Sequence, residues 1–193
     1  MHKALEVVGV ELEPADPLGK GKPNTHILGE TFFSMAALRY GDYIAKIWAT
    51  PLSDSVKALQ GQEIDGSNDS ALRDLVVSFF AHDSAEYELG AQLCTDLNTM
   101  PIEDGSVEWP QAQSPYQPIA KLVIPAQEAY SPARRVYVDD VLTFNPFHCL
   151  PEHRPLGNIM RVRRLAYEAS SQYRHQMNMQ PRVEPRSIDE LPD

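Results

Sequence analysis

The stretch RVRRLAYEASSQYR, residues 161–174, is the most informative part of the chain because it places one tyrosine among arginines at helical spacing. Each residue of an α-helix advances by roughly 100°, so Arg163, Tyr167 and Arg174 fall within about 40° of one another. They therefore form one stripe that faces one partner. The helical pattern extends over about 155–177, and Pro155 suits its first turn because a proline there sacrifices no helical hydrogen bond.

The residue types of this stripe suit a phenolate ligand to ferric haem. A guanidinium one turn before a tyrosine stabilises the phenolate anion, and tyrosine is one of the few protein ligands that haem iron accepts. Arg174, further along the stripe, can pair with a haem propionate. The alternative is that Tyr167 is a half-buried aromatic residue on an amphipathic helix whose arginines face water, since both residue types are common at half-exposed helical positions.

Three landmarks precede the helix, in an order and spacing that resemble catalases: VEWP at 107–110, PIAKLVI at 118–124 and VDDVLTFNP at 138–146. Further upstream, LGETFF at 28–33 and RYGDYIAK at 39–46 are similar to the divergent, short catalase-like proteins. The resemblance extends from about residue 24 to residue 174. It implies an α+β fold with a partial antiparallel β-barrel of the catalase type, followed by C-terminal helices.

The resemblance also implies roles for four residues. In catalases the proximal helix carries R-x-x-x-Y with a further arginine seven residues after the tyrosine, and Arg163, Tyr167 and Arg174 match these positions. Tyr167 is then expected as the axial ligand of the iron in haem b, Arg163 as the residue that favours the phenolate, and Arg174 as the anchor of a propionate. Phe144 is expected to pack beside the porphyrin.

The proximal motif departs from the usual catalase pattern at several positions. Arg164, Leu165 and Ala169 stand where the family has an aliphatic residue, phenylalanine and aspartate, and Ser171 stands where histidine is frequent. The distal histidine and asparagine of catalases come from segments earlier than anything matched here. Peroxide cleavage needs a base within hydrogen-bond distance of both oxygens, so we assign no catalytic residue in this chain.

Hydrophobic periodicity predicts the remaining elements. A helix is expected over 70–80, with Asp69 or Ser70 as its cap. We expect residues 1–178 to form the catalase-like barrel portion and residues 179–193 to form a flexible, proline-rich tail. Strands are expected at 4–12, 30–33, 43–49, 85–97, 119–124 and 135–141, with the second and third of these paired.

Composition excludes several classes of function. The formal net charge of −10 argues against binding of nucleic acid, which is held mainly by lysine and arginine. The two cysteines, Cys94 and Cys149, lack a close cysteine neighbour, so neither a disulfide framework nor a Cys-x-x-Cys metal site is indicated, and reduced cytoplasmic thiols are expected. No apolar run approaches the about 20 residues needed to span a bilayer.

Two hypotheses follow for the function. The first is a haem-binding oxidoreductase of the catalase or peroxidase type that acts on hydrogen peroxide or an organic hydroperoxide, with its distal residues supplied from elsewhere. The second is a truncated, non-enzymatic barrel that serves as a binding or assembly module. An open barrel exposes strand edges and an apolar face, so this second hypothesis predicts a homo-oligomer or a partner chain that completes the barrel.

Overall fold

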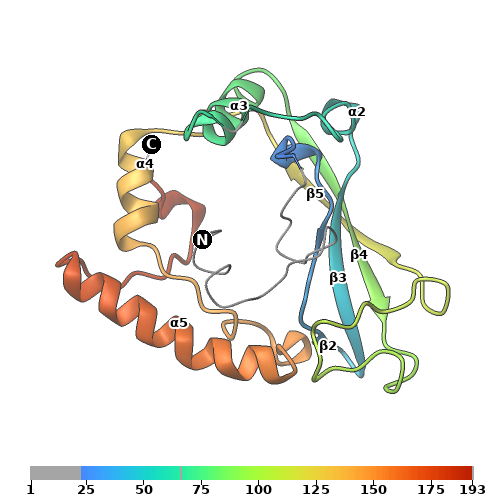
Figure 1. Cartoon of the computed structure of the whole chain (residues 1–193). Coiled ribbons are helices and arrows are strands. Elements are labelled where there is room, and N and C mark those ends of the chain that lie inside the picture. Colours follow the sequence, from blue (N-terminus) through green and yellow to red (C-terminus); the bar gives the residue numbers. More distant parts are fainter. Residues whose placement is uncertain (1–22, 66, 193) are drawn as a thin grey trace, which may run out of the picture.

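The computed structural model describes residues 23–65 and 67–192 and has a mixed α/β architecture with one antiparallel sheet (Figure 1). The strand predicted at 4–12 lies outside the described residues. The elements in chain order are η1 (Ile27–Gly29), β1 (Phe32–Phe33), β2 (Leu38–Tyr40), β3 (Tyr43–Pro51), α2 (Asp54–Lys57), α3 (Ala71–Phe80), β4 (Ala85–Leu93), β5 (Gln117–Ile124), α4 (Pro132–Val136), η2 (Tyr137–Val141), η3 (Pro151–His153), α5 (Asn158–Met177) and η4 (Ile188–Glu190).

The sheet has the strand order β1-β3-β4-β5, and β2 also pairs with β3. The β2–β3 hairpin turns at Gly41, whose φ of 62° lies in the left-handed region that favours glycine. Within the described residues the sheet does not close, because β5 pairs only with β4 and β1 only with β3. The antiparallel sheet of the prediction is therefore confirmed, whereas its description as a partial barrel is not.

Most of the predicted elements occur at their expected places. The strands expected at 30–33 and 43–49 pair as β1 and β3, with Phe32 opposite Ala49. The helix expected over 70–80 is α3, and Ser70 is its N-cap residue, although the Ser70 side chain makes no capping hydrogen bond. Strand β5 covers the segment predicted at 119–124, and β4 begins at the predicted residue 85 but ends at Leu93, before the predicted end at 97.

The strand predicted at 135–141 is wrong, because this segment is helical and forms the end of α4 and all of η2. Its alternating valines favour a strand, but the preceding residues start a helix. The Ser131 side chain accepts a hydrogen bond from the Arg134 backbone N–H, and Pro132 occupies the first turn, where proline is well tolerated. The local helix start therefore overrides the β-propensity of the valines.

Helix α5 begins at Asn158, three residues after Pro155, so Pro155 is not in its first turn. Pro155 instead forms an isolated bridge with Leu38 of β2, which joins the approach to α5 to the edge of the sheet. Gly157 is the N-cap residue, with a φ of 86°. A side chain at Gly157 would place its Cβ 2.4 Å from the carbonyl oxygen of Ile102, so only glycine fits this approach.

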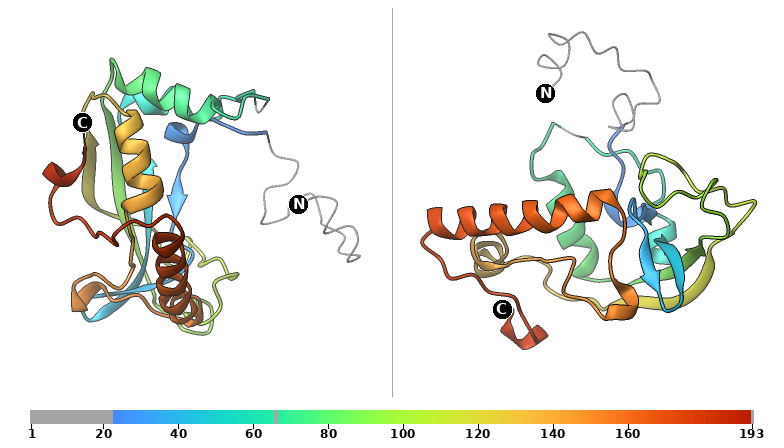
Figure 2. Two further views of the ribbon diagram at one scale, coloured as in Figure 1. Left: turned by 90° about the vertical axis from the view of Figure 1, so that its left-hand side faces the viewer. Right: turned by 90° about the horizontal axis from the view of Figure 1, so that it is seen from below.

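The apolar core is divided into two small clusters. One joins α2, α3 and β4 through Val56, Phe80 and Tyr87. The other packs Met100 and Trp109 beneath the loops beside the sheet. Helix α5 runs from the β2 end of the sheet toward α4 (Figure 1), and Figure 2 shows it end-on in the left view and along its length in the right view. Its buried residues are Met160, Ser171 and His175, so α5 is held largely by polar contacts.

The segment predicted as a flexible tail makes specific contacts in its described part. Val183 forms a parallel bridge with Leu142, and its carbonyl oxygen accepts a hydrogen bond of 3.0 Å from the Thr143 backbone N–H. Arg182 pairs with Glu168 of α5 at 2.6 Å. Among the described residues, no helix combines the length and the apolar character needed to cross a membrane.

Candidate functional site

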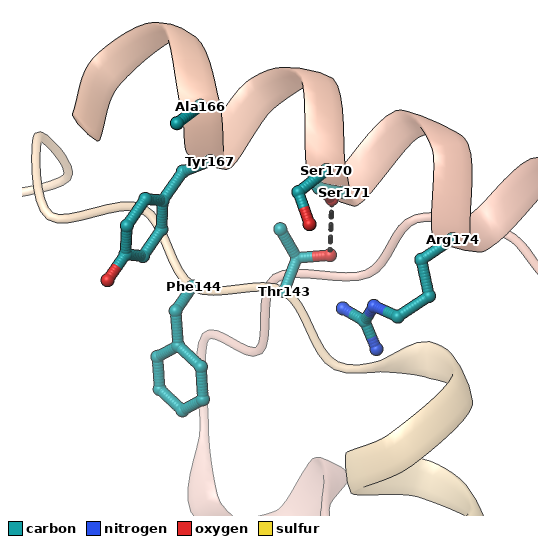
Figure 3. Close-up of a pocket in the computed structure, with 7 residues that line it drawn as sticks. All are labelled: Thr143, Phe144, Ala166, Tyr167, Ser170, Ser171 and Arg174. Carbon is teal, nitrogen blue, oxygen red and sulfur yellow. Dashed lines mark hydrogen bonds between the residues drawn. The ribbon is translucent and has the colours of Figure 1, made fainter. Parts of the chain in front are cut away.

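Tyr167 lines an open cavity of about 400 Å³ between α5 and the segment that follows η2 (Figure 3). The α5 side of the cavity is built at helical spacing, because residues three, four and seven positions after Tyr167 lie on its face. Three of the four predicted site residues, Phe144, Tyr167 and Arg174, meet here, and Arg163 does not line the cavity. The lining residues are Thr143, Phe144, Ala166, Tyr167, Ser170, Ser171 and Arg174.

Two aromatic rings of the cavity are open to solvent. Tyr167 is 40% exposed, and its hydroxyl makes no hydrogen bond with a described residue. Phe144 is 71% exposed, which is unusual for a phenylalanine that no neighbour covers. Figure 3 shows both rings pointing away from α5, and the small side chains of Ala166 and Ser170 leave the space beside them free. The cavity therefore offers an unused phenol next to an uncovered apolar ring.

Arg174 joins α5 to the segment that carries Phe144 through two hydrogen bonds. Its two terminal nitrogens donate to the carbonyl oxygens of Asp139 and Leu142, at 2.5 and 2.6 Å. These carbonyls belong to the last turn of η2 and to the residue after it, where backbone acceptors lack helical partners. The guanidinium thus lies at the cavity wall and fixes the backbone two residues before Phe144.

Arg163 lies one turn before Tyr167 on the same helix, as its spacing predicts. It is half-buried, and one of its terminal nitrogens is 3.8 Å from the sulfur of Met160. No contact with the Tyr167 hydroxyl occurs among the described residues. The stripe predicted from sequence is therefore present on α5, but only Tyr167 and Arg174 from it face the cavity.

A buried polar cluster of Thr143, Ser171 and His175 adjoins the cavity, whose wall includes Thr143 and Ser171. The Thr143 and Ser171 hydroxyl oxygens are 3.3 Å apart. The His175 nitrogens lie against two backbone carbonyls, with Nδ1 2.7 Å from Ser171 O and Nε2 2.8 Å from Val141 O. These bonds join α5 to residues 141–143 and so set the distance between Tyr167 and Phe144.

The comparisons with known proteins come from structure alone, because neither a family model nor a curated protein sequence matches the chain. A fungal catalase superposes with a TM-score of 0.56 and 16% identity, over 78% of this chain and 32% of its own. Catalase A from Saccharomyces cerevisiae superposes with a TM-score of 0.57 and 16% identity, over 80% of this chain and 33% of its own. The chain has a catalase-like fold. It spans about a third of the length of the two catalases.

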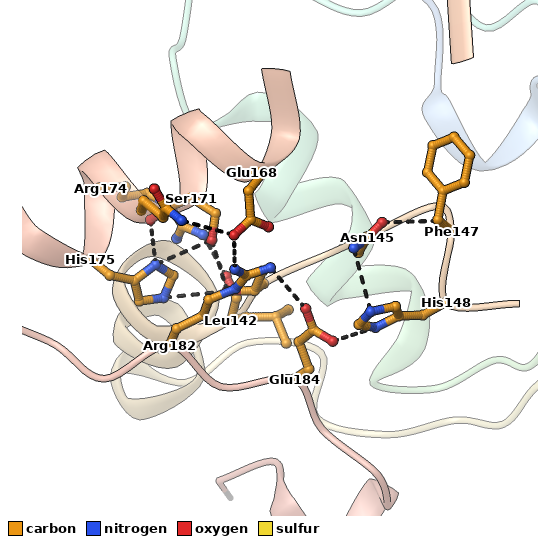
Figure 4. A network of polar contacts seen from close by, with 12 residues as sticks. Leu142, Asn145, Phe147, His148, Glu168, Ser171, Arg174, His175, Arg182 and Glu184 are labelled. Carbon is orange, nitrogen blue, oxygen red and sulfur yellow. Dashed lines mark hydrogen bonds and ion pairs between the residues drawn. The ribbon is translucent and has the colours of Figure 1, made fainter. Parts of the chain in front are cut away.

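An ionic network holds the C-terminal segment of this catalase-like chain against α5 (Figure 4). Arg182 pairs with Glu168 at 2.6 Å and with Glu184 at 3.2 Å, and Glu184 in turn contacts His148. The hydrogen bond from Arg182 holds the pKa of Glu168 below its usual range. Asn145 joins this network through His148, at 3.4 Å. The network thus supports the turn directly after Phe144 from its outer side.

Several residues in or beside the Tyr167 cavity were not predicted from sequence: the lining residues Thr143, Ala166, Ser170 and Ser171, and the neighbouring His175. The available signal was positional, because Ser170 and Ser171 follow Tyr167 by three and four residues. Within the described part of the chain, no cluster of three or more His, Cys, Asp or Glu side chains could hold a metal ion. The thiols of Cys94 and Cys149 are free.

Proposed function

We propose that this chain forms the proximal part of a haem-binding site of the catalase type, with Tyr167 as the axial ligand of the ferric iron. The observation that carries the proposal is the uncommitted phenol of Tyr167, which lines an open cavity on a helix of a catalase-like fold. Tyrosine ligates haem iron in catalases, and a phenol without a hydrogen-bond partner is free to give up its proton and bind.

The residues around Tyr167 fit the cofactor. The exposed ring of Phe144 supplies an apolar surface for a macrocycle, and Ala166 and Ser170 are small enough to leave room for one. Arg174 lies at the edge of the cavity as the candidate partner of a propionate, while its bonds to Asp139 O and Leu142 O hold the wall in place. We assign Arg163 the role of favouring the Tyr167 phenolate across one helical turn.

With haem b bound through tyrosinate, such a site supplies oxidation by hydrogen peroxide or an organic hydroperoxide. This chain would hold the cofactor through Tyr167 and offer the Phe144 ring as an apolar contact. Peroxide cleavage also needs a distal acid–base group, and we assign that role to no residue among 23–65 and 67–192. We therefore expect binding without efficient turnover when the chain is alone.

The test is an absorption titration of the purified chain with ferric haem. Wild-type protein is expected to give a high-spin, tyrosinate-type spectrum, and Tyr167→Phe is expected to lose it. Tyr173→Phe is the matched control, because Tyr173 lies on the same helix and is exposed but does not line the cavity. Identical weak spectra from wild type and Tyr167→Phe would refute ligation by Tyr167.

A second candidate function is that of a binding or assembly module, in which a second copy or a partner chain covers the open sheet. It is favoured by strand β5, an edge strand with Ile119, Leu122 and Val123 all substantially exposed. Size-exclusion chromatography with light scattering tests this function. A stable, haem-free monomer would count against it, whereas a defined oligomer would support it.

A further inference from the structure

A separate cavity of about 510 Å³ lies between α4, η2 and the last described residues, which we call the α4 cavity. Figure 1 shows the C-terminal end of the chain beside α4, where Pro192 accepts a hydrogen bond from Arg134. The volume falls within the range of about 300–1,000 Å³ that is usual for small-molecule sites. None of its lining residues belongs to the Tyr167 cavity, so it is independent of the proposed haem site.

Arg134 brings a positive charge to the wall of the α4 cavity. Its Nε donates to Pro192 O at 2.9 Å, and one terminal nitrogen donates to Glu128 O. Both partners are neutral carbonyls, and among residues 23–65 and 67–192 no carboxylate lies within 4.0 Å of the guanidinium. The neighbouring Arg135 differs, because it pairs with Asp139 at 3.4 Å. Of these two arginines, only Arg134 has no carboxylate partner among the described residues, so its charge is available to an anion.

Tyr137 adds a second group whose hydrogen-bonding capacity is unused. Tyr137 is a lining residue of the α4 cavity, and its buried hydroxyl has no partner among the described residues. A buried hydroxyl without a partner is rare in folded proteins because it costs free energy. Arg134 and Tyr137 lie three positions apart, on one face of the continuous α4–η2 helical segment. An acceptor between them would satisfy both groups.

The rest of the cavity wall is largely apolar, with the polar Gln127 and one opposing charge. Asp189 lies at the wall, where its carboxylate accepts a hydrogen bond of 3.0 Å from the Ser187 hydroxyl. This negative charge disfavours a dianion such as a phosphate ester, because one guanidinium compensates only one charge. The apolar lining residues are Ala129, Val138, Ile188, Leu191 and Pro192.

We propose that the α4 cavity binds a monocarboxylate with an aliphatic body. Its carboxylate accepts hydrogen bonds from the Arg134 guanidinium, and the Tyr137 hydroxyl donates a further one. The aliphatic body packs on the side chains of η2 and η4. The charge-assisted bond to arginine gives the site its preference for an acid over a neutral molecule of the same shape.

The test is a titration of the haem-free, ¹⁵N-labelled full chain with octanoate, followed through backbone amide shifts. We expect saturable shifts confined to residues 127–138 and 188–192, and binding of octanol at least about tenfold weaker. Arg134→Gln should weaken octanoate binding by about tenfold or more. Arg135→Gln is the matched control on the same helix and should bind octanoate as the wild type does.

Tyr137→Phe provides a second test in case the Arg134→Gln variant does not fold. It leaves the contacts of Arg134 with Pro192 and Glu128 in place. It should bind octanoate about threefold more weakly than wild type. Equal affinity for octanol and octanoate, shifts that map to the Tyr167 cavity, or no saturable shifts at all would each overturn the proposal. The outcome does not depend on haem binding, because no haem is present.

Discussion

Gly157 holds the chain in a conformation that other residues rarely adopt, directly before the helix that carries Tyr167. Its φ of 86° and ψ of 169° lie in a region that is essentially restricted to glycine. We expect Gly157→Ala to lower the free energy of unfolding by about 1–3 kcal/mol, because a Cβ would also meet Ile102 O. Urea denaturation measures the change. Gly61→Ala is a control with a positive φ of 69° but open space around the Cβ, and it should cost less.

His175 makes a second prediction at the residue scale. Its buried ring lies between Val141 O and Ser171 O, so His175→Leu leaves Val141 O without this partner. We expect a loss of about 1–3 kcal/mol in the free energy of unfolding, measured by urea denaturation. His82→Leu, at an exposed position, should change it by less than about 0.5 kcal/mol. Equal effects of the two substitutions would contradict a stabilising role for the contacts of His175 with Val141 O and Ser171 O.

The sequence predicts the helix face on which the site residues lie, but it does not predict all of their contacts. The spacing of Tyr167 and Arg174 predicts that they share a face of α5, and they do. Spacing could not predict that the terminal nitrogens of Arg174 donate to Asp139 O and Leu142 O, because Asp139 lies in the segment predicted as a strand and Leu142 directly follows it. Helical periodicity predicts on which face of a helix a side chain lies. The residues that this side chain contacts depend on how the rest of the chain packs against the helix.

At the scale of elements, the start of α4 explains why β-propensity wrongly predicted a strand at 135–141. The valines at 136, 138 and 141 favour a strand, but the Ser131 cap and Pro132 set the backbone before them. We expect Ser131→Ala to destabilise the protein by about 1 kcal/mol, because it removes the hydrogen bond to the Arg134 N–H. Ser70→Ala is the matched control, since Ser70 is an N-cap residue whose side chain makes no capping bond.

Thermal unfolding of the two serine variants, each beside wild type, measures the difference. A shift in Tm for Ser131→Ala, with little change for Ser70→Ala, is the expected result. If both variants unfold at the wild-type temperature, the cap does not determine the helical state of the segment. The same logic explains the elements that sequence did predict, such as α3 and β4, where local propensity and packing agree.

At the scale of the whole molecule, strand periodicity indicates which residues share a face of the sheet but not where the sheet ends. The partial barrel of the prediction implied exposed strand edges, but periodicity could not show that β5 forms such an edge or that α5 lies beyond the sheet. The C-terminal segment belongs to this scale as well, because its contacts join α5, η2 and the turn after Phe144. Arg182 is central to these contacts, through Glu168 and Glu184.

The ion pairs of Arg182 predict that low pH weakens the contacts between the C-terminal segment and α5. The hydrogen bond from Arg182 lowers the pKa of Glu168 in the folded protein. A carboxyl whose pKa is lower in the folded state than in the unfolded state stabilises the fold at pH values above its unfolded-state pKa. This contribution is lost as the pH falls through its folded-state pKa. The Thr143 amide, which donates to Val183 O, reports the loss through hydrogen exchange. Its protection should fall as the pH drops below the ordinary range of a glutamate.

Two substitutions separate this effect from general acid unfolding. Arg182→Gln should lower the protection of the Thr143 amide already at neutral pH and remove most of its pH dependence. Arg161→Gln breaks an exposed ion pair with Glu103 near the other end of α5, so it should leave that protection unchanged. Both pairs are exposed to solvent, so added salt should weaken the wild-type effect as well. If Thr143 exchanges equally in wild type and Arg182→Gln, the network does not hold the C-terminal segment to α5.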